Sequence, residues 1–372
     1  MPTQDGGAPA AEPDSAALLR AASQAGYPVT GRMLETFRAQ GLLPRPRRVG
    51  YHGRAPVWRY PPGADRQLAA LLRRRQDTKD PDILKVLLWL DGFAIPSSVV
   101  GEALARQLRA VTDTIEREIS QQAERLDLDP ADDRARSHAI ATLARTMAAR
   151  RGTTQIPRRS RVRAEDRARA IAVVIRLFGL GESIDGTEAD AAAVERVLGI
   201  APNGRRHGID DAGPWLTGPA EDLFGAARIT GLPGLLEAVE QASQADLAAA
   251  RQTVIALCRH LPLMVRMIGA MFGDDNYIGL ANLSQLDQHP EFVLYLVPMV
   301  IAMQQAGWNE NLDAVTSALR QFPELAAQAQ RILDMPAATV KANLAGKPPE
   351  VREQAQHLIN AAIEGRFDGP VP

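Results

Sequence analysis

Arginine is concentrated near the start of this sequence, in a pattern suited to binding phosphate. Between Arg20 and Lys79 there are thirteen Lys or Arg residues and three Asp or Glu residues, whereas the whole 372-residue chain has 43 basic and 44 acidic residues. Guanidinium groups bind phosphate oxygens through paired, charge-assisted hydrogen bonds. A basic end on a mildly acidic body therefore indicates that this end binds a polyanion. A compositional bias toward Arg explains why only four of the basic residues are Lys, but it does not explain the clustering.

Two short helices are expected to present the first of these arginines. Asp14 or Ser15 is a suitable N-cap for the first helix, and Gly26 is a suitable end for it. Thr30 is a suitable N-cap for the second helix, which Gly41 ends. About four residues join the two helices, which is the layout of a helix-turn-helix.

Residues 45–60 predict a small β-hairpin, or wing, rather than a third helix. The helix-breaking residues are Pro46, Gly50, Gly53 and Pro56, and the strand-favouring residues between them are Val49, Tyr51, Val57 and Trp58. Alternation of this kind, with turn residues near the middle, favours two short antiparallel strands. We expect Trp58 and Tyr60 to pack the hairpin against the helices, and stacking on a base is the alternative.

The spacing of residues from Thr30 to Pro44 is distinctive. Leu34 follows the capping Thr30 by four residues, Phe37 occupies the next turn, and the segment closes on Gly41-Leu42-Leu43-Pro44. This segment resembles the recognition helix of the MerR family of bacterial transcription regulators. The pairs Arg47-Arg48, Gly50-Tyr51 and Arg59-Tyr60 resemble elements of that family's wing, with extra residues between them. The resemblance covers about residues 15–100 and implies a winged helix-turn-helix DNA-binding domain.

The resemblance and the charge pattern together predict the residues that contact DNA. We expect the recognition helix, 31–40, to enter the major groove and the Arg-rich wing to contact the backbone. Leu34 and Phe37 share one face and anchor the helix, while Arg32 reaches a guanine edge or a phosphate. Where the family often has Arg-Tyr, this chain has Glu35 and Thr36. Glu35 must then face a base edge, pair with a neighbouring arginine, or lie away from DNA. The predicted contacts are Thr30, Arg32, Thr36, Arg38, Arg45, Arg47, Arg48, Tyr51, Arg54 and Arg59. For each arginine taken singly, a solvated surface position is the alternative.

Beyond the wing the sequence predicts an almost entirely helical chain, so the fold class is mostly α. We expect disorder over 1–13, the DNA-binding domain over 14–96, a long helix and dimerisation region over 97–150, a basic linker over 151–164, and an all-helical effector or interaction domain over 165–372. The long helix, from Ser97 to about Leu128, has an apolar stripe with steps of three, four or seven residues. That stripe packs either on a second subunit or on the chain's own C-terminal domain.

Catalytic and metal-binding signals are weak. The single cysteine, Cys258, excludes an internal disulfide and a multi-cysteine metal site. The six histidines show no ligand spacing, and we find no phosphate-binding loop or dinucleotide fingerprint. We therefore predict no catalytic residues and no cofactor. The longest apolar run, 292–303, is shorter than the ~20 residues that a membrane span needs, so we expect a cytoplasmic, nucleoid-associated protein without a membrane partner.

These patterns favour a sequence-specific transcriptional regulator that binds double-stranded DNA. A homodimer is expected, because two recognition helices suit a palindromic site. The C-terminal region would then bind a small-molecule or protein effector. The main alternative is a helical interaction or adaptor protein whose N-terminal module does not act as a regulator, and an enzyme with an unrecognised helical site is a distant third.

Overall fold

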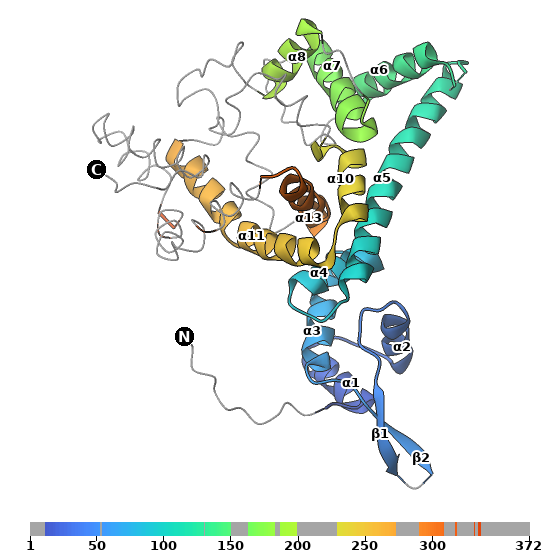
Figure 1. Cartoon of the computed structure of the whole chain (residues 1–372), viewed down its shortest axis with the longest axis vertical. Helices are drawn as coiled ribbons and strands as arrows, with labels where there is room; N and C mark the ends of the chain where they lie inside the picture. The colour runs from blue at the N-terminus through green and yellow to red at the C-terminus, as the bar shows by residue number, and fades with distance from the viewer. Residues whose placement is uncertain are drawn as a thin grey trace. The chain divides into compact units, whose positions relative to one another are not determined.

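The computed structural model describes residues 12–52, 54–129, 131–149, 163–182, 187–198, 229–272 and 290–308, with Ser317, Arg331, Asp334 and Met335. The chain divides into two compact units, Met1–Leu104 (unit 1) and Ala105–Pro372 (unit 2). The described part is mostly helical, with one two-stranded antiparallel hairpin after the first two helices (Figure 1). The predicted mostly-α fold class, with one small hairpin near the N-terminus, is confirmed for the described residues.

Unit 1 begins with two short helices that have side-chain caps. Helix α1 (Ser15–Gln24) starts where an oxygen of Asp14 accepts a hydrogen bond from the backbone N–H of Ala17 at 2.7 Å. Helix α2 (Gly31–Ala39) starts where Oγ1 of Thr30 accepts from the N–H of Met33 at 3.3 Å. Each helix ends before a glycine in the left-handed region, Gly26 at φ 84° and Gly41 at φ 73°, a backbone conformation that glycine adopts without strain. The sequence predicted both helices and both ends.

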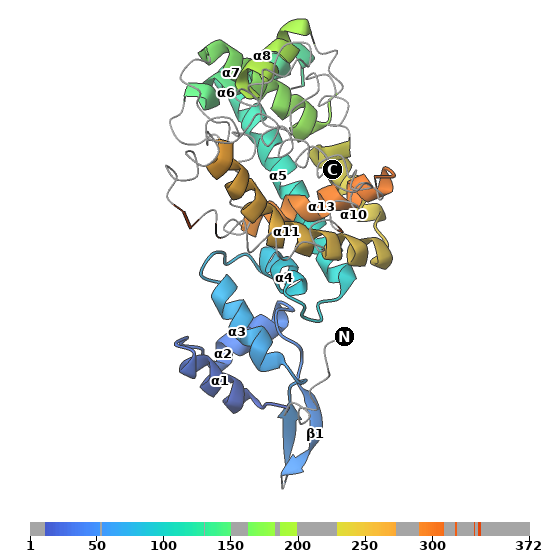
Figure 2. The ribbon, with the colours of Figure 1, turned by 90° about the vertical axis from the view of Figure 1, so that its left-hand side faces the viewer.

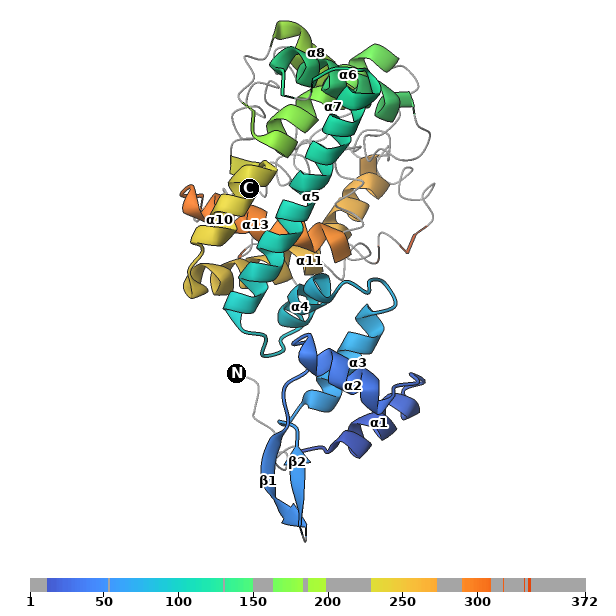
Figure 3. The same ribbon diagram turned by 90° about the vertical axis from the view of Figure 1, so that its right-hand side faces the viewer.

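The hairpin follows α2. Strand β1 (Arg47–His52) pairs with β2 (Ala55–Arg59) in an antiparallel register that sets Arg47 opposite Arg59 and Arg48 opposite Trp58. A β-bulge between Arg48 and Gly50 interrupts the register. The two strands extend away from the helices of unit 1 (Figures 1 and 3).

Two further helices complete the core of unit 1. Helix α3 (Ala64–Arg74) packs on α1, and on α4 (Pro81–Leu90), which Asp80 caps (Figure 2). The side chain of Gln67 is buried and its Nε2 donates to the carbonyl of Leu42 at 2.9 Å, so α3 fixes the turn that ends α2. The fully buried large side chains of this core are Leu18, Leu34, Phe37, Leu42, Tyr60, Leu68, Leu71, Leu84 and Leu88.

Unit 2 is built around a long helix, α5 (Ser97–Arg125), which starts in unit 1 and is prominent in Figure 3. Its C-terminal half packs on α6 (Asp133–Ala149) and α7 (Ala164–Val174). Small residues dominate this cluster, so the helices approach closely: Ile119, Ala123, Ala139, Ile140, Ala144, Ala148, Ala168, Ile171 and Ile175. The apolar stripe is therefore buried within the chain at this end, one of the two alternatives that the sequence left open.

The remaining described elements of unit 2 are helical, as predicted. A π-helix, η1 (Ile175–Gly179), continues α7, and α8 (Glu188–Leu198) begins after Thr187. Helix α13 (Pro290–Gln305) packs on α10 (Leu232–Gln241) and α11 (Gln244–Phe272). Most of the basic linker 151–164 and much of the predicted C-terminal domain, 165–372, lie outside the described residues.

Within the described part of the chain, no helix combines the length and the apolar character that crossing a membrane would require.

Candidate nucleic-acid interface

Helix α2 has one buried and one exposed face. Leu34 and Phe37 are 1 % and 0 % exposed, and they hold the helix against the core of unit 1. Arg32, Glu35 and Thr36 are exposed on the other side. The residues that the sequence placed toward DNA on this helix are thus accessible, and those that it placed in the core are buried.

Local contacts determine what the α2 side chains can bind. The Oγ1 of Thr36 donates a hydrogen bond to the carbonyl of Arg32 at 3.1 Å, so its proton is used and the oxygen remains an acceptor. Glu35 forms an ion pair with Arg38 at 3.8 Å, which is one of the three positions considered for this carboxylate. Arg32 has no ion pair with any carboxylate that the structure describes.

The hairpin has two faces of different chemistry. Directly opposed residues in an antiparallel pair point to the same side, so Arg47, Arg59 and Val57 share one face, which we call the paired face. Arg48, Tyr51, Pro56 and Trp58 share the other, which we call the aromatic face. Residues three apart on a regular strand point to opposite sides. The extra residue of the bulge is therefore what brings Arg48 and Tyr51 to one side.

Acidic residues that precede α1 occupy the arginines of the paired face. Arg47 forms an ion pair with Glu12, and Nη1 of Arg59 donates to Asp14 at 2.9 Å. Between them, the carbonyl of Pro13 accepts from the N–H of Tyr60 at 2.8 Å. Glu12 and Pro13, which the sequence assigned to a disordered segment, thus lie among the described residues and contact the hairpin.

Asp14 connects the hairpin to α1. It caps the helix through Ala17 and pairs with Arg59. The hydrogen bond from the Ala17 N–H, assisted by the charges of Arg59 and Arg20, lowers the pKa of the Asp14 carboxyl below its ordinary value, although partial burial opposes this. The carboxylate form is the one that holds both contacts.

The aromatic face is open to solvent. The guanidinium of Arg48 lies 5.2 Å from the centre of the Tyr51 ring and donates to the Tyr51 hydroxyl at 2.7 Å. Tyr51 is 62 % exposed and Trp58 is 50 % exposed. Tyr60 is buried, at 1 %, and packs the hairpin on the helices as predicted. The same prediction for Trp58 is wrong, because its side chain is half exposed on the aromatic face.

The predicted contacts thus fall into groups with different availability. Thr30, Arg32, Thr36, Arg45, Arg47, Arg48, Tyr51 and Arg54 are exposed, and Arg38 and Arg59 are partly buried. Arg45 and Arg54, like Arg32, have no ion pair with a described carboxylate. Sequence reasoning missed Glu12 and Asp14 as partners of the wing arginines, since 35 and 45 residues separate each pair.

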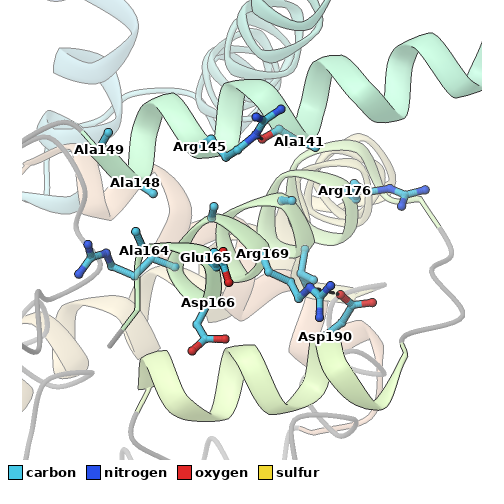
Figure 4. A pocket seen from close by; sticks show the side chains of 14 residues that line it. Ala141, Arg145, Ala148, Ala149, Ala164, Glu165, Asp166, Arg169, Arg176 and Asp190 are labelled. Atoms are coloured by element: carbon cyan, nitrogen blue, oxygen red, sulfur yellow. Dashed lines mark hydrogen bonds and ion pairs between the residues drawn. The ribbon is translucent and has the colours of Figure 1, made fainter. Parts of the chain in front are cut away.

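Unit 2 offers a pocket of another kind, between α6 and α7 and beside α8 (Figure 4). Two of the arginines that line it form ion pairs: Arg169 pairs with Asp190 at 3.6 Å, and Arg176 pairs with Glu182, outside the lining, at 2.7 Å. We assign no ligand to it. No cluster of His, Cys, Asp or Glu suited to a metal ion occurs within the described ranges.

No protein-family model, curated protein or solved structure matches this chain. The function must therefore be inferred from the geometry of unit 1.

Proposed function

We propose that this chain is a sequence-specific DNA-binding transcriptional regulator, and that unit 1 is its winged helix-turn-helix domain. The observation that carries the proposal is the exposed face of α2. A short helix, anchored by Leu34 and Phe37 and with a free N-terminal end, presents Arg32 and Thr36 outward. Side chains near the N-terminus of such a helix reach base edges when the helix lies in the major groove.

The two exposed side chains have different roles in this proposal. The guanidinium of Arg32 has no ion pair with a carboxylate in the described ranges, and it suits the O6 and N7 acceptors of guanine or a phosphate oxygen. Thr36 is left as an acceptor by its bond to the Arg32 carbonyl, which suits the amino group of adenine or cytosine. Arg38 is drawn toward Glu35, so it contributes less to phosphate binding than Arg32.

The hairpin is the wing of the domain. Arg45 and Arg54 are exposed and have no carboxylate partner in the part of the chain that the structure describes. They contact phosphates, fix the register of the protein on the duplex and produce most of the salt dependence. Arg47 and Arg59 already hold Glu12 and Asp14, so in this proposal they orient the wing.

We further propose that the regulator binds as a homodimer and that unit 2 receives the small-molecule or protein effector. Two copies would place two α2 helices on two half-sites about one helical turn apart. Sedimentation of the full chain with and without DNA would measure the stoichiometry.

Competition binding at graded salt tests the proposed function. The full chain is titrated against a duplex chosen by selection from random sequences, in the presence of excess unrelated DNA. We expect retention of the selected duplex and a log affinity that falls linearly with log salt, with a slope of about 0.9 per phosphate contacted. Absence of binding at low salt, or equal affinity for all sequences, contradicts the proposal.

A protein-interaction or adaptor function is the second candidate. It is favoured by the half-exposed apolar side chains of the hairpin, Val49 at 47 %, Tyr51 at 62 % and Trp58 at 50 %, since contiguous exposed apolar surface marks interaction sites. Under this function the arginines of the wing would be solvated, and charge-removing variants would leave the partner bound.

A further inference from the structure

We infer that the aromatic face of the hairpin is a second, nonpolar contact with DNA, in which the Trp58 indole lies against deoxyribose rings beside a phosphate that Arg48 binds. This inference rests on the proposed function, because it assumes that unit 1 binds a duplex. It assigns a contact to Trp58, which neither the charge pattern nor the predicted contacts include.

The exposure of Trp58 is the first observation. The indole is 50 % exposed although it is a large apolar group, and Tyr51 and Val49 near it on the hairpin are 62 % and 47 % exposed. Exposed apolar surface of this size lowers solubility unless a partner covers it. Deoxyribose presents C–H groups next to the phosphates, so a flat ring covers apolar surface there while leaving the phosphates to arginine.

The charge of the aromatic face selects DNA as that partner. Arg48 lies opposite Trp58 in the hairpin register and has no carboxylate partner among the residues that the structure describes. Its bonds to Tyr51 leave further N–H donors of the guanidinium for a phosphate. The excess of ten positive charges between Arg20 and Lys79 favours a polyanion over a protein surface that is neutral or has few acidic residues.

The charges of the paired face also favour an orientation in which the aromatic face approaches the duplex. The arginines of the paired face are neutralised by Glu12 and Asp14, and a phosphate brought to that face would meet two carboxylates. Because these ion pairs leave the paired face without net positive charge, a phosphate is attracted more strongly to the unpaired guanidinium of Arg48 on the aromatic face. The bulge at Val49 is the local feature that sets Arg48 on that face together with Tyr51.

Salt titration separates this nonpolar contact from a phosphate contact. An apolar contact releases no counterions, so its loss lowers affinity without changing the salt slope, whereas loss of one phosphate contact lowers the slope by about 0.9. With the full chain and its selected duplex, we expect Trp58→Ala to weaken binding about tenfold at an unchanged slope. Trp58→Phe, which keeps a flat ring, should stay within about threefold of the original protein.

A matched control and a direct readout complete the experiment. Trp308 in unit 2 is 46 % exposed, so Trp308→Ala removes an equally exposed indole and should leave DNA affinity unchanged. The chain has four tryptophans, and subtracting the fluorescence of Trp58→Phe isolates the signal of Trp58. We expect the selected duplex to quench that signal. Tyr51→Ala tests the neighbouring ring and should weaken binding in the same direction.

The possible results distinguish failure of this inference from failure of the proposed DNA-binding function. If the original protein binds its duplex and Trp58→Ala binds it equally well, the inference fails and the proposed function stands. If Trp58→Ala lowers the slope by about one, Trp58 positions Arg48 and makes no contact of its own. If Trp58→Ala changes the sedimentation of the protein without DNA, a second copy covers this face and the inference is overturned. If the original protein binds no DNA, both fail.

Discussion

Arg48 on the hairpin and Arg136 on α6 show the same side chain in opposite settings. Arg136 donates from both terminal nitrogens to Glu116 of α5, at 2.8 Å each, and from Nε to Glu182 at 3.3 Å. Its pKa is raised, first through the hydrogen bonds that it donates to Glu116, and the pKa of Glu116 is lowered by the same contact. Arg48 has no ion pair with a described carboxylate, and its guanidinium contacts the exposed ring and hydroxyl of Tyr51. One guanidinium is committed to the fold, and the other is available to a ligand.

Counts of charged residues alone therefore do not locate a DNA-binding surface. Unit 2 contains many arginines, but several are neutralised within the fold, among them Arg109 by Glu240 and Arg196 by Asp166. In unit 1 the arginines that we expect at DNA include four that lack any described carboxylate partner: Arg32, Arg45, Arg48 and Arg54. Those four, rather than the whole cluster, account for the predicted electrostatic attraction.

The largest expected effect is a loss of stability when Arg136, which is paired within the fold, is replaced. Arg136→Ala leaves Glu116 without the guanidinium that holds it, and leaves Glu182 paired with Arg176, so we expect the free energy of unfolding to fall by about 2 kcal/mol. Chemical denaturation measures it. Arg134→Ala, on the same helix and without an ion pair to a described residue, should change stability by less than about 0.5 kcal/mol. Equal losses in the two variants would remove the contrast.

Removing the available arginines should affect binding and leave the fold intact. We expect Arg45→Ala with Arg54→Ala to lower affinity for the selected duplex by about tenfold and the salt slope by about 1.8, because two phosphate contacts are lost. The thermal midpoint should not change. Arg117→Ala with Arg134→Ala removes two exposed arginines of unit 2 and serves as the charge-matched control. If both double variants weaken binding equally, the site is not the wing.

Asp14 has both a structural and a binding-related role, because it caps α1 and neutralises Arg59 of the wing. Asp14→Ala should cost about 1 kcal/mol of stability through the lost cap, and Asp14→Asn, which keeps a capping oxygen, should cost less. Since the pKa of Asp14 is lowered on folding, its contribution is complete at pH values above its ordinary pKa of 3.8. It disappears as the pH falls through the lower folded value. Denaturation of the original protein and Asp14→Asn from pH 6 to pH 2 should therefore converge at the acid end; parallel curves would count against the ion pair.

The smallest expected effect is at Thr36. Thr36→Val removes the acceptor oxygen at nearly the same volume, so discrimination at one base pair should weaken by no more than about threefold. Thr36→Ser keeps the hydroxyl and should behave like the original protein. Competition with duplexes that differ at single positions measures this. Uniform weakening across all positions would assign Thr36 to the backbone.

Local signals made much of unit 1 predictable. Asp14, Thr30 and Asp80 each cap the helix that the sequence indicated, and Gly26 and Gly41 end α1 and α2 in the left-handed conformation. Caps and turns depend on residues within a few positions of each other, so they can be identified from sequence spacing. The burial of Leu34 and Phe37 follows from the helical period in the same way.

The chemistry of the hairpin could not be predicted for two physical reasons. The ion pairs of Arg47 and Arg59 join residues that are 35 and 45 positions apart, and no local pattern specifies such contacts. The bulge at Val49 shifts the alternation of β1 by one residue, which places Tyr51 on the same side of the hairpin as Arg48. The residue type of Trp58 predicts burial, whereas its side chain is 50 % exposed on the aromatic face.

Selection of DNA from a random pool by the full chain tests whether α2 is the recognition helix of a sequence-specific DNA-binding protein. We expect enrichment of one motif, arranged as inverted half-sites about one helical turn apart if the protein binds as a dimer. It also predicts that Arg32→Ala relaxes the preference at a single position of each half-site, because that guanidinium lies on the exposed face of α2. A pool that stays random, or a motif that Arg32→Ala leaves unchanged at every position, would contradict the assignment of α2 as the recognition helix.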